Sequence, residues 1–275
     1  MPTETVYGLA ADATNGKAVA GIYTAKGRPS FNPLIVHVRD LAAAERIAVF
    51  DDVARALAKQ YWPGPLTLVL PFRPDSGIAS LVTAGLPTIA IRVPAHPAMQ
   101  ALLSATGKPL AAPSANASGR ISPTRAGHVL KSLGGHVSLV IDAGSTEVGL
   151  ESTIVAVGPD GTLRLLRAGP IDLGLSLAAS GAIEAPGQLA SHYAPAKPLR
   201  LNATTAEPDE WLIGFGGVAG DDSLSVSGDL TEAAARFFNA LHEADASKRP
   251  RIAIAPIPQT GLGIAINDRL NRAAA

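Results

Sequence analysis

Two cations, Lys26 and Arg28, lie one residue apart in the stretch KGRPSFNPLIVH, between a helical pattern and a rigid Asn32-Pro33 turn. Neighbouring lysine and arginine side chains suit an anionic ligand, because both combine hydrogen-bond donors with a positive charge. The pair is equally explained without a ligand by the helix macrodipole, which favours positive charge at a helix C-terminus. The residues alone leave both interpretations open.

Arg92 ends the apolar stretch TIAIR, four residues after Thr88. On a strand this spacing places both side chains on the same face. A buried arginine needs a partner, and the candidates are a ligand carboxylate or phosphate, Glu4 or Glu151. Arg92 is therefore the residue for which a ligand-binding role is hardest to dismiss.

Further polar residues cluster where predicted strands give way to loops. PTETVYGL (2–9) carries three polar residues before an aromatic one, ESTIV (151–155) begins a strand, and LRAG (166–169) ends the next. The loop APSANASGRISPT (112–124) holds Ser114, Asn116, Ser118, Arg120 and Ser122. Its end has the composition of a helix N-cap, and a capped helix start also binds anions.

The histidines do not indicate a metal cage built by the protein. His37 alternates with Ile35 in an apolar strand, which is typical of a buried, hydrogen-bonded histidine. His96, His128 and His136 lack the spacing of metal ligands. An oxygen-rich site without cysteine suits Mg²⁺ held mainly by substrate phosphates.

Several familiar catalytic signatures are absent from the sequence. The chain has no cysteine, no G-x-x-x-x-G-K-[ST] loop, no H-E-x-x-H and no G-x-S-x-G. The stretch GFGGVAG (214–220) has the wrong glycine spacing for a dinucleotide loop, so a strand-to-loop turn is favoured there. Thiolate catalysis, disulfides and a P-loop are excluded.

An α/β fold is predicted to position these side chains, because apolar runs of strand length alternate with helical patterns. Strands are predicted at 34–38, 66–71, 88–93, 109–113, 137–142, 152–157 and 163–167, and helices at 17–25, 41–49, 51–61, 97–105 and 124–133. In an open α/β sheet, ligands bind where strands end.

The alternation fails after about residue 168, and three prolines in EAPGQLASHYAPAKP indicate a linker. Beyond it, strands at 211–215 and 251–257, a helix at 230–246 and a final helix from 261 predict a second, smaller α/β unit. We expect a catalytic domain at 1–170, a linker at 171–198 and a C-terminal domain at 199–275.

The bulk composition excludes few partners. Lys+Arg and Asp+Glu both number 23, so net charge predicts neither a nucleic-acid nor an acidic partner. No apolar stretch has the length of a membrane span, and no basic segment followed by an apolar one stands at the N-terminus. We expect a cytoplasmic protein with no membrane partner.

Six motifs occur in the order PTETVYGLAADA, KGRPSFNPLIVHV, TIAIRVP, AAPSANASGRISPT, VGLESTIV and LRAG. In this order and spacing they resemble the YrdC/Sua5 family of threonylcarbamoyl-AMP synthases, and SHYAP and GLGIAINDRL resemble its two-domain Sua5 branch. The resemblance implies a YrdC-like twisted open sheet with helices and a deep concave site. It also implies a small, Rossmann-like α/β Sua5 domain after the linker.

The resemblance further implies a nucleotidyltransferase that joins L-threonine, bicarbonate or CO₂, and ATP into threonylcarbamoyl-AMP and releases pyrophosphate. ATP would be a substrate accompanied by Mg²⁺, and tRNA an indirect partner, because the product feeds the t6A transferase machinery. The anion at Lys26 and Arg28 would then be the ATP triphosphate, with both residues catalytic. A carbamate is a weak, unstable nucleophile, so positioning and charge neutralisation matter more than a covalent nucleophile.

Carried over by motif, the resemblance places Thr5, His37, Arg92 and Ser152 around threonine. It places Lys26, Arg28, Asn32, Thr88, Ser114, Ser122, Arg167 and Tyr193 around the nucleotide. Arg92 would bind the amino-acid carboxylate and Lys26 the phosphates. Tyr193 would close over ATP as part of a lid, although without the resemblance ordinary linker packing is the preferred interpretation.

The sequence departs from the family pattern at its start, where Met1 directly precedes PTETVYGL and family members usually have a further helix and strand. We therefore expect either that the start is truncated or misassigned, or that the sheet lacks an edge element near Thr5. DAGSTEVG (142–149) also replaces a more glycine-rich loop. Two alternatives stay open: a truncated, inactive nucleotide-binding homologue, and a double-stranded RNA or tRNA-binding module. Zero net charge and few aromatic residues argue against the second.

Overall fold

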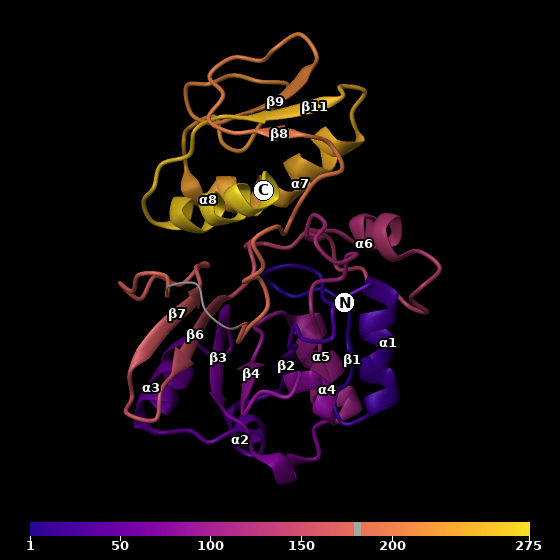
Figure 1. The fold of residues 1–275 in the computed structure, drawn as a ribbon, viewed down its shortest axis with the longest axis vertical. Coiled ribbons are helices and arrows are strands. Elements are labelled where there is room, and N and C mark those ends of the chain that lie inside the picture. Colours follow the sequence, from indigo (N-terminus) through magenta and orange to yellow (C-terminus); the bar gives the residue numbers. More distant parts are fainter. Residues whose placement is uncertain (179–182) are drawn as a thin grey trace.

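Seven strands form the larger of two sheets in the computed structural model, which describes residues 1–178 and 183–275 (Figure 1). The strand order is β1-β5-β2-β4-β3-β6-β7. The bounds in that order are Ala11–Asp12, Leu110–Ala111, Ile35–His37, Thr88–Arg92, Leu66–Pro71, Thr153–Val157 and Leu163–Arg167. The pairs β2/β4 and β3/β6 are parallel and the other neighbours are antiparallel.

The strand register brings polar residues to one edge of this sheet. His37 pairs with Arg92 across β2 and β4, so the carboxyl ends of two parallel strands carry adjacent side chains on one face. Strands β3 and β6 begin at the same edge, because Leu66 pairs with Thr153 and β3 runs antiparallel to β4. The opposite face of β2 and β4, which includes Val36 and Ile91, belongs to the main hydrophobic core.

Helix α1 (Gly16–Lys26) delivers Lys26 and Arg28 to the site edge. It begins at Asn15, whose side chain accepts hydrogen bonds from two backbone N–H groups of the first turn. It ends at Gly27, whose φ of 58° lies in the left-handed region that glycine adopts without strain. The remaining helices of this domain are α2 (Leu41–Glu45), α3 (Asp52–Tyr61), η1 (Pro74–Ser76), α4 (Ser80–Thr83), α5 (Pro97–Thr106) and α6 (Ala126–Leu133).

The C-terminal domain has its own parallel sheet, in the order β10-β9-β11-β8. Its strands in that order are Asp222–Ser223, Glu210–Gly214, Arg251–Ile254 and Leu199–Arg200. Helices α7 (Leu230–Ala246) and α8 (Leu262–Ala273) lie between this sheet and the larger domain (Figure 1). The two helices therefore form the surface that meets the larger domain (Figure 1).

The α/β class is confirmed, and the strongly apolar segments form the predicted strands. The prediction of a strand at 137–142 is wrong, because Val137 and Val140 pack against the α6 cluster instead of joining a sheet, and Leu139 is 77% exposed. The helix predicted at 41–49 ends at Glu45. The chain then turns so that the Val49 N–H donates to the carbonyl of Pro71 at the end of β3. No helix among the described residues is long and apolar enough to cross a membrane.

Candidate active site

A narrow cavity of about 50 Å³ lies at the polar edge of the large sheet. Most of the side chains singled out in the sequence line it, namely Thr5, Arg28, His37, Arg92, Ser114, Ser152, Arg167 and Tyr193. They come from the N-terminal segment, the strand ends and the linker. Lys26, Asn32 and Ser122 lie behind this wall and bond to its residues or its backbone, whereas Thr88 lies elsewhere.

Arg92 is the centre of a buried ion pair at the end of β4. Its Nη2 lies 2.6 Å from Glu4 Oε1, its Nη1 donates to Thr5 Oγ1 at 2.9 Å, and its Nε donates to the carbonyl of Gly64 at 3.2 Å. Burial works to raise the pKa of Glu4, but the charge and hydrogen bonding of Arg92 outweigh it, so this pKa is lowered. Of the two carboxylates considered for Arg92, the structure selects Glu4.

Arg92 Nη2 is paired with Glu4 Oε1 at 2.6 Å, but a guanidinium carries five N–H groups, so N–H groups remain beyond those that meet Glu4, Thr5 and the Gly64 carbonyl among the described residues. A buried donor of this kind favours a ligand that can accept from it. Arg92 thus combines a fixed position with an unused donor. That combination fits a ligand carboxylate.

His37 lies beside Arg92 as a neutral imidazole. Burial, followed by the positive charge of Arg92, lowers its pKa to about 3. Its Nδ1 is buried and has no hydrogen-bond partner among the described residues. His37 is buried, as the residue pattern predicts, and it lines the cavity. Hydrogen bonding with the backbone of Ile35 and Leu110 opposes the lowering of its pKa.

Ser152 is held by hydrogen bonds from two strands. Thr67 Oγ1 lies 2.7 Å from Ser152 Oγ, Arg167 Nη2 donates to the same Oγ at 3.1 Å, and Arg167 Nε donates to the Ser152 carbonyl at 3.0 Å. Gly169 allows this approach, because a Cβ there would contact Thr153 N and come within 2.8 Å of the Glu151 carbonyl. The LRAG motif therefore places Arg167 against the start of β6.

Arg28 and Lys26 have different surroundings. Arg28 lines the cavity, and its Nη2 donates to Asn32 Oδ1 at 2.7 Å and to the Pro33 carbonyl at 2.9 Å. Burial lowers its pKa to about 10. Lys26 Nζ donates to the backbone carbonyls of Ser114, at 2.6 Å, and Asn116, and burial lowers its pKa. In this conformation Lys26 braces the loop that forms the cavity wall.

A second buried chain joins Ser122 to the C-terminal domain. Ser122 Oγ donates to Glu151 Oε1 at 2.5 Å, and Glu151 Oε2 lies 3.2 Å from Nε of Arg269 on α8. The sequence offered Glu151 only as a partner for Arg92 and gave no role to Arg269. The GLGIAINDRL stretch that contains Arg269 was the available signal, but it did not indicate a contact with the catalytic domain.

Two further residues complete the placement of the predicted set. Tyr193 is buried, with a φ of 65°, and its ring lies 5.7 Å from the ring of Phe238 on α7. Thr88 shares a sheet face with Arg92 but pairs with Pro71 at the other edge of the sheet. The structure does not bring Thr88 to the cavity.

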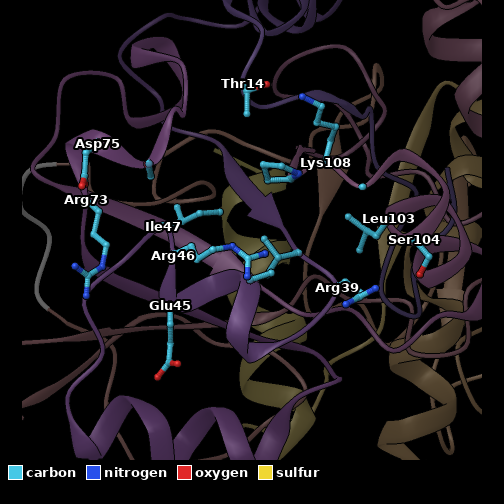
Figure 2. Close-up of a pocket in the computed structure, with 15 residues that line it drawn as sticks. Thr14, Arg39, Glu45, Arg46, Ile47, Arg73, Asp75, Leu103, Ser104 and Lys108 are labelled. Atoms are coloured by element: carbon cyan, nitrogen blue, oxygen red, sulfur yellow. The ribbon is translucent and has the colours of Figure 1, made fainter.

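A larger cavity of about 780 Å³ lies on the other side of β2, where Val38 and Arg39 line it (Figure 2). It contains none of the predicted residues. The guanidinium groups of Arg39, Arg46 and Arg73 lie apart from one another in Figure 2, and all three residues are exposed. Because the cations of the larger cavity do not converge, the smaller cavity is the stronger candidate for catalysis.

Comparisons with known proteins agree on both halves of the chain. Residues 1–169 match the Sua5/YciO/YrdC family, described as "Telomere recombination", and residues 156–275 match the "Threonylcarbamoyl-AMP synthase, C-terminal domain". The threonylcarbamoyl-AMP synthase of Bacillus subtilis is 41% identical, and the alignment covers 100% of this chain and 88% of that protein. The synthase of Pyrococcus abyssi is 35% identical, with 100% and 89% covered.

A solved structure shares the same architecture. The crystal structure of P. abyssi Sua5 complexed with L-threonine has a TM-score of 0.90 at 34% identity, covering 99% of this chain and 89% of that one. The similarity thus extends across the catalytic domain, the linker and the C-terminal domain. The chain belongs to the Sua5/YciO/YrdC family, and it carries the C-terminal domain of the threonylcarbamoyl-AMP synthases.

Proposed function

We propose that this chain is a threonylcarbamoyl-AMP synthase, which joins L-threonine, bicarbonate and ATP into threonylcarbamoyl-AMP and pyrophosphate. The observation that carries the proposal is the full-length similarity to a Sua5 structure complexed with L-threonine. A cavity at the edge of the large sheet supports it. Arg92, which has N–H groups left for a ligand, and the neutral His37 lie there beside the guanidinium groups of Arg28 and Arg167. These groups suit an amino acid on one side and a polyphosphate on the other.

The threonine half of the site is built on Arg92. The N–H groups of its guanidinium that Glu4, Thr5 and Gly64 do not engage donate to the substrate carboxylate, while Glu4 and Thr5 keep the guanidinium oriented. His37 and Ser152 lie beside it and bond to the polar groups of the amino acid. A neutral His37 adds no charge next to the threonine amine, which must lose its proton before it can capture CO₂.

The nucleotide half is built on Arg28 and Arg167. Both are buried, and neither forms an ion pair with a carboxylate within the described part of the chain. Burial lowers the pKa of each, which means that positive charge is costly there until an anion arrives. The triphosphate supplies that anion. Asn32, Ser114 and Ser122 are proposed to assist on the nucleotide side, whereas Thr88 lies too far from the cavity to do so.

The reaction needs few covalent contributions from the protein. A carbamate oxygen of N-carboxythreonine attacks the α-phosphorus of ATP, and the bond from that phosphorus to the bridging oxygen breaks to release pyrophosphate. Arg28 and Arg167 stabilise the developing negative charge, and the closed cavity keeps water from the unstable carbamate. Lys26 contributes to the phosphates when its Nζ leaves the Ser114 and Asn116 carbonyls.

Mg²⁺ is proposed to enter with ATP, coordinated mainly by phosphate oxygens. The carboxylates nearest the cavity are already engaged, Glu4 by Arg92 and Glu151 by Ser122 and Arg269. When bound, the ion would further neutralise the charge of the triphosphate. The protein side chains then orient the nucleotide rather than ligate the metal.

The segment that carries Tyr193 is proposed to act as a lid. The cavity of about 50 Å³ is far smaller than the ~300–1,000 Å³ of typical ligand sites. Pro186, Gly187, His192 and Tyr193 from the linker line it. ATP enters when this segment moves outward, and its return excludes water. The product is proposed to supply the t6A modification of tRNA through a separate transferase.

The proposal is tested by mixing the purified chain with ATP, Mg²⁺, bicarbonate and L-threonine and following pyrophosphate and the adenylate by mass spectrometry. Serine replaces threonine in one control, and bicarbonate is omitted in another. Adenylate is expected only with threonine and bicarbonate together. A folded chain that binds ATP but makes no adenylate would contradict the proposal, and would leave the inactive nucleotide-binding alternative.

A further inference from the structure

Thr67 places a buried hydroxyl in an otherwise apolar strand. It is the second residue of β3, is 0% exposed, and shares a sheet face with Val69, which belongs to a small apolar cluster. Valine would fill nearly the same volume, and a buried hydroxyl costs free energy unless it is hydrogen-bonded. The hydroxyl at this position therefore has a role that an apolar side chain could not fill.

That hydroxyl contacts a residue of the cavity wall. Thr67 Oγ1 lies 2.7 Å from Ser152 Oγ, which is its one side-chain hydrogen bond within the described residues. Ser152 Oγ has a second contact, because Arg167 Nη2 donates to it at 3.1 Å. Each hydroxyl carries one proton and two lone pairs. The contact between the two hydroxyls uses only one of their two protons, so the other proton has no acceptor in the described part of the chain.

The positions of the two hydroxyls decide which proton is left over. Ser152 lines the cavity, whereas Thr67 lies behind the wall and is enclosed by protein. If Ser152 donated to Thr67, the Thr67 proton would be buried without an acceptor, at a cost in free energy. Thr67 is therefore the donor. The lone pairs of Ser152 are then taken by Thr67 and Arg167, and the Ser152 O–H is left to donate into the cavity.

In this arrangement Ser152 can bind only a hydrogen-bond acceptor. An ammonium group has donors alone and would find no lone pair there, whereas carboxylate and carbamate oxygens accept. Strand β3 lies between β4, which carries Arg92, and β6, which Ser152 precedes, so these two strands are ~10 Å apart along the sheet. An amino-acid carboxylate at Arg92 therefore leaves Ser152 to the group on the amino side of the substrate.

We propose that Thr67 is a positioning residue that fixes Ser152 as a donor to the N-carboxylate of threonine, the carbamate group whose oxygen attacks the α-phosphorus. The inference rests on the proposed function and specifies which polar group of the amino acid Ser152 binds. Arg167 holds Ser152 from the nucleotide side, which places this donor between the two halves of the cavity. A weak nucleophile reacts faster when its orientation is fixed, so this donor contributes to the rate.

Four full-length variants and one control test the role of Thr67. Thr67→Val removes the hydroxyl with little change in volume, and Thr67→Ser restores it. Ser152→Ala removes the proposed donor, and Thr67→Val combined with Ser152→Ala shows whether Thr67 acts through Ser152. Thr83→Val is the matched control, because Thr83 is also buried but its hydroxyl donates to the Ser80 carbonyl at 3.3 Å within α4.

Binding of two ligands is measured by calorimetry without ATP. One is L-threonine, and the other is N-carbamoyl-L-threonine, a stable analogue in which a carbonyl oxygen takes the place of a carbamate oxygen. We expect Thr67→Val to weaken binding of the analogue roughly three- to tenfold, the range of one neutral hydrogen bond, and binding of threonine by less than about twofold. Thr67→Ser and Thr83→Val should bind both ligands as the wild type does.

The remaining variants show whether the effect passes through Ser152. Ser152→Ala should lose at least as much affinity for the analogue as Thr67→Val, and the double variant should lose no more than Ser152→Ala alone. In the turnover assay, Thr67→Val should lower kcat roughly three- to tenfold and leave the KM for threonine nearly unchanged. A change in the fold as a whole would not separate the two ligands or the two kinetic constants in this way.

Equal weakening of both ligands in Thr67→Val, or no weakening of either, would overturn the proposal. Additive losses in the double variant, a Thr67→Ser variant that fails to restore binding, or a wild type that binds threonine but not the analogue would do the same. If Thr67→Val does not fold, Thr67→Ala also lacks the hydroxyl and must show the same selective loss. A wild type that binds the analogue but makes no adenylate refutes the proposed function, and the binding comparison still decides the role of Thr67.

Discussion

At the scale of single residues, Arg92 is the group on which recognition of the amino acid depends. A lysine at this position keeps the positive charge beside Glu4 but cannot also bond to Thr5 and to the Gly64 carbonyl while presenting a donor to the substrate. We expect Arg92→Lys to weaken threonine binding roughly tenfold or more, with ATP affinity nearly unchanged. Calorimetric titration with each substrate measures the two affinities.

The matched control for this prediction is Arg39→Lys, because Arg39 follows the neighbouring strand but has a side chain that is 62% exposed and, within the described residues, forms an ion pair only with Asp40. It should leave both affinities unchanged. An Arg92→Lys variant that binds threonine as tightly as the wild type would remove Arg92 from the carboxylate site.

Gly169 sets how closely β7 can approach the start of β6. An alanine there would push its Cβ against Thr153 N and the Glu151 carbonyl, so the backbone that carries Ser152 and Arg167 would have to shift. We expect Gly169→Ala to lower the free energy of unfolding by about 1–3 kcal/mol. Gly21→Ala is the control, because Gly21 lies within α1 with open space around it, and should raise stability by up to about 1 kcal/mol. A higher free energy of unfolding for Gly169→Ala than for Gly21→Ala, measured by urea denaturation, would show that Gly169 does not set this approach.

At the scale of elements, the loop at 112–118 is held by a buried lysine of another element. Lys26 is 3% exposed and donates to two carbonyls of this loop. Lys26→Met keeps the apolar stem and leaves those carbonyls without their donor. We expect a loss of about 1–3 kcal/mol in the free energy of unfolding in the absence of any ligand. An unchanged unfolding free energy would mean that Lys26 acts only on the phosphates.

The elements also show how far the sequence could predict the fold and the site. Strongly apolar strands such as β3 and β6 were predictable, because burial on both faces demands continuous apolar runs. Caps at Asp40 and Asp51 were predictable from local chemistry. The failed strand at 137–142 has suitable residues, but whether a short apolar run pairs with a strand or packs on a helix depends on tertiary neighbours.

The site shows the same limit. The family resemblance grouped Thr5, His37 and Arg92. Strand register places His37 beside Arg92, and Thr5 joins them through the hydrogen bond that its Oγ1 accepts from Arg92. The predicted strands and their register could not reveal that Glu151 binds Arg269. That contact spans 118 residues of sequence and depends on how two domains pack. Long-range pairs of this kind leave no local periodicity or spacing to detect.

At the scale of the whole molecule, two histidines stack where the domains meet. The rings of His128 on α6 and His242 on α7 lie 3.8 Å apart between centroids, and His242 Nε2 lies 3.1 Å from the Ser122 carbonyl. Burial, followed by the proximity of His242, lowers the pKa of His128 to about 3, and burial lowers that of His242 to about 4. Arg125 and Lys131 also disfavour protonation of His128, whereas Asp245 favours protonation of His242.

Lowered histidine pKa values give the stability a defined pH dependence. The unfolded chain takes up protons below pH ~6.5, the ordinary pKa of histidine, while the folded chain does not until much lower pH. Stability is therefore fully present above pH ~6.5 and is lost as the pH falls from there toward the folded values of about 3 and 4. His37 and His192, with pKa values of about 3, add to the same loss.

We expect the free energy of unfolding, measured by urea denaturation, to fall between pH 7 and pH 5, and to fall less steeply in His242→Gln. The variant removes one group that must stay neutral in the folded state. Its control is His136→Gln, at a histidine that is exposed. An equally steep fall in wild type and His242→Gln would show that the interdomain stack does not contribute to the pH dependence.

If one cavity joins the three substrates into an adenylate, the carbon of bicarbonate must appear in the product, and isotope-labelled bicarbonate reveals it. The chain is incubated with ATP, Mg²⁺, L-threonine and the labelled bicarbonate, and the products are analysed by tandem mass spectrometry. We expect the label in the carbonyl carbon between the threonine nitrogen and the AMP phosphate, with equal amounts of pyrophosphate and adenylate formed. ATP consumption that yields unlabelled threonyl-AMP, or no conjugate of threonine and AMP, would contradict it.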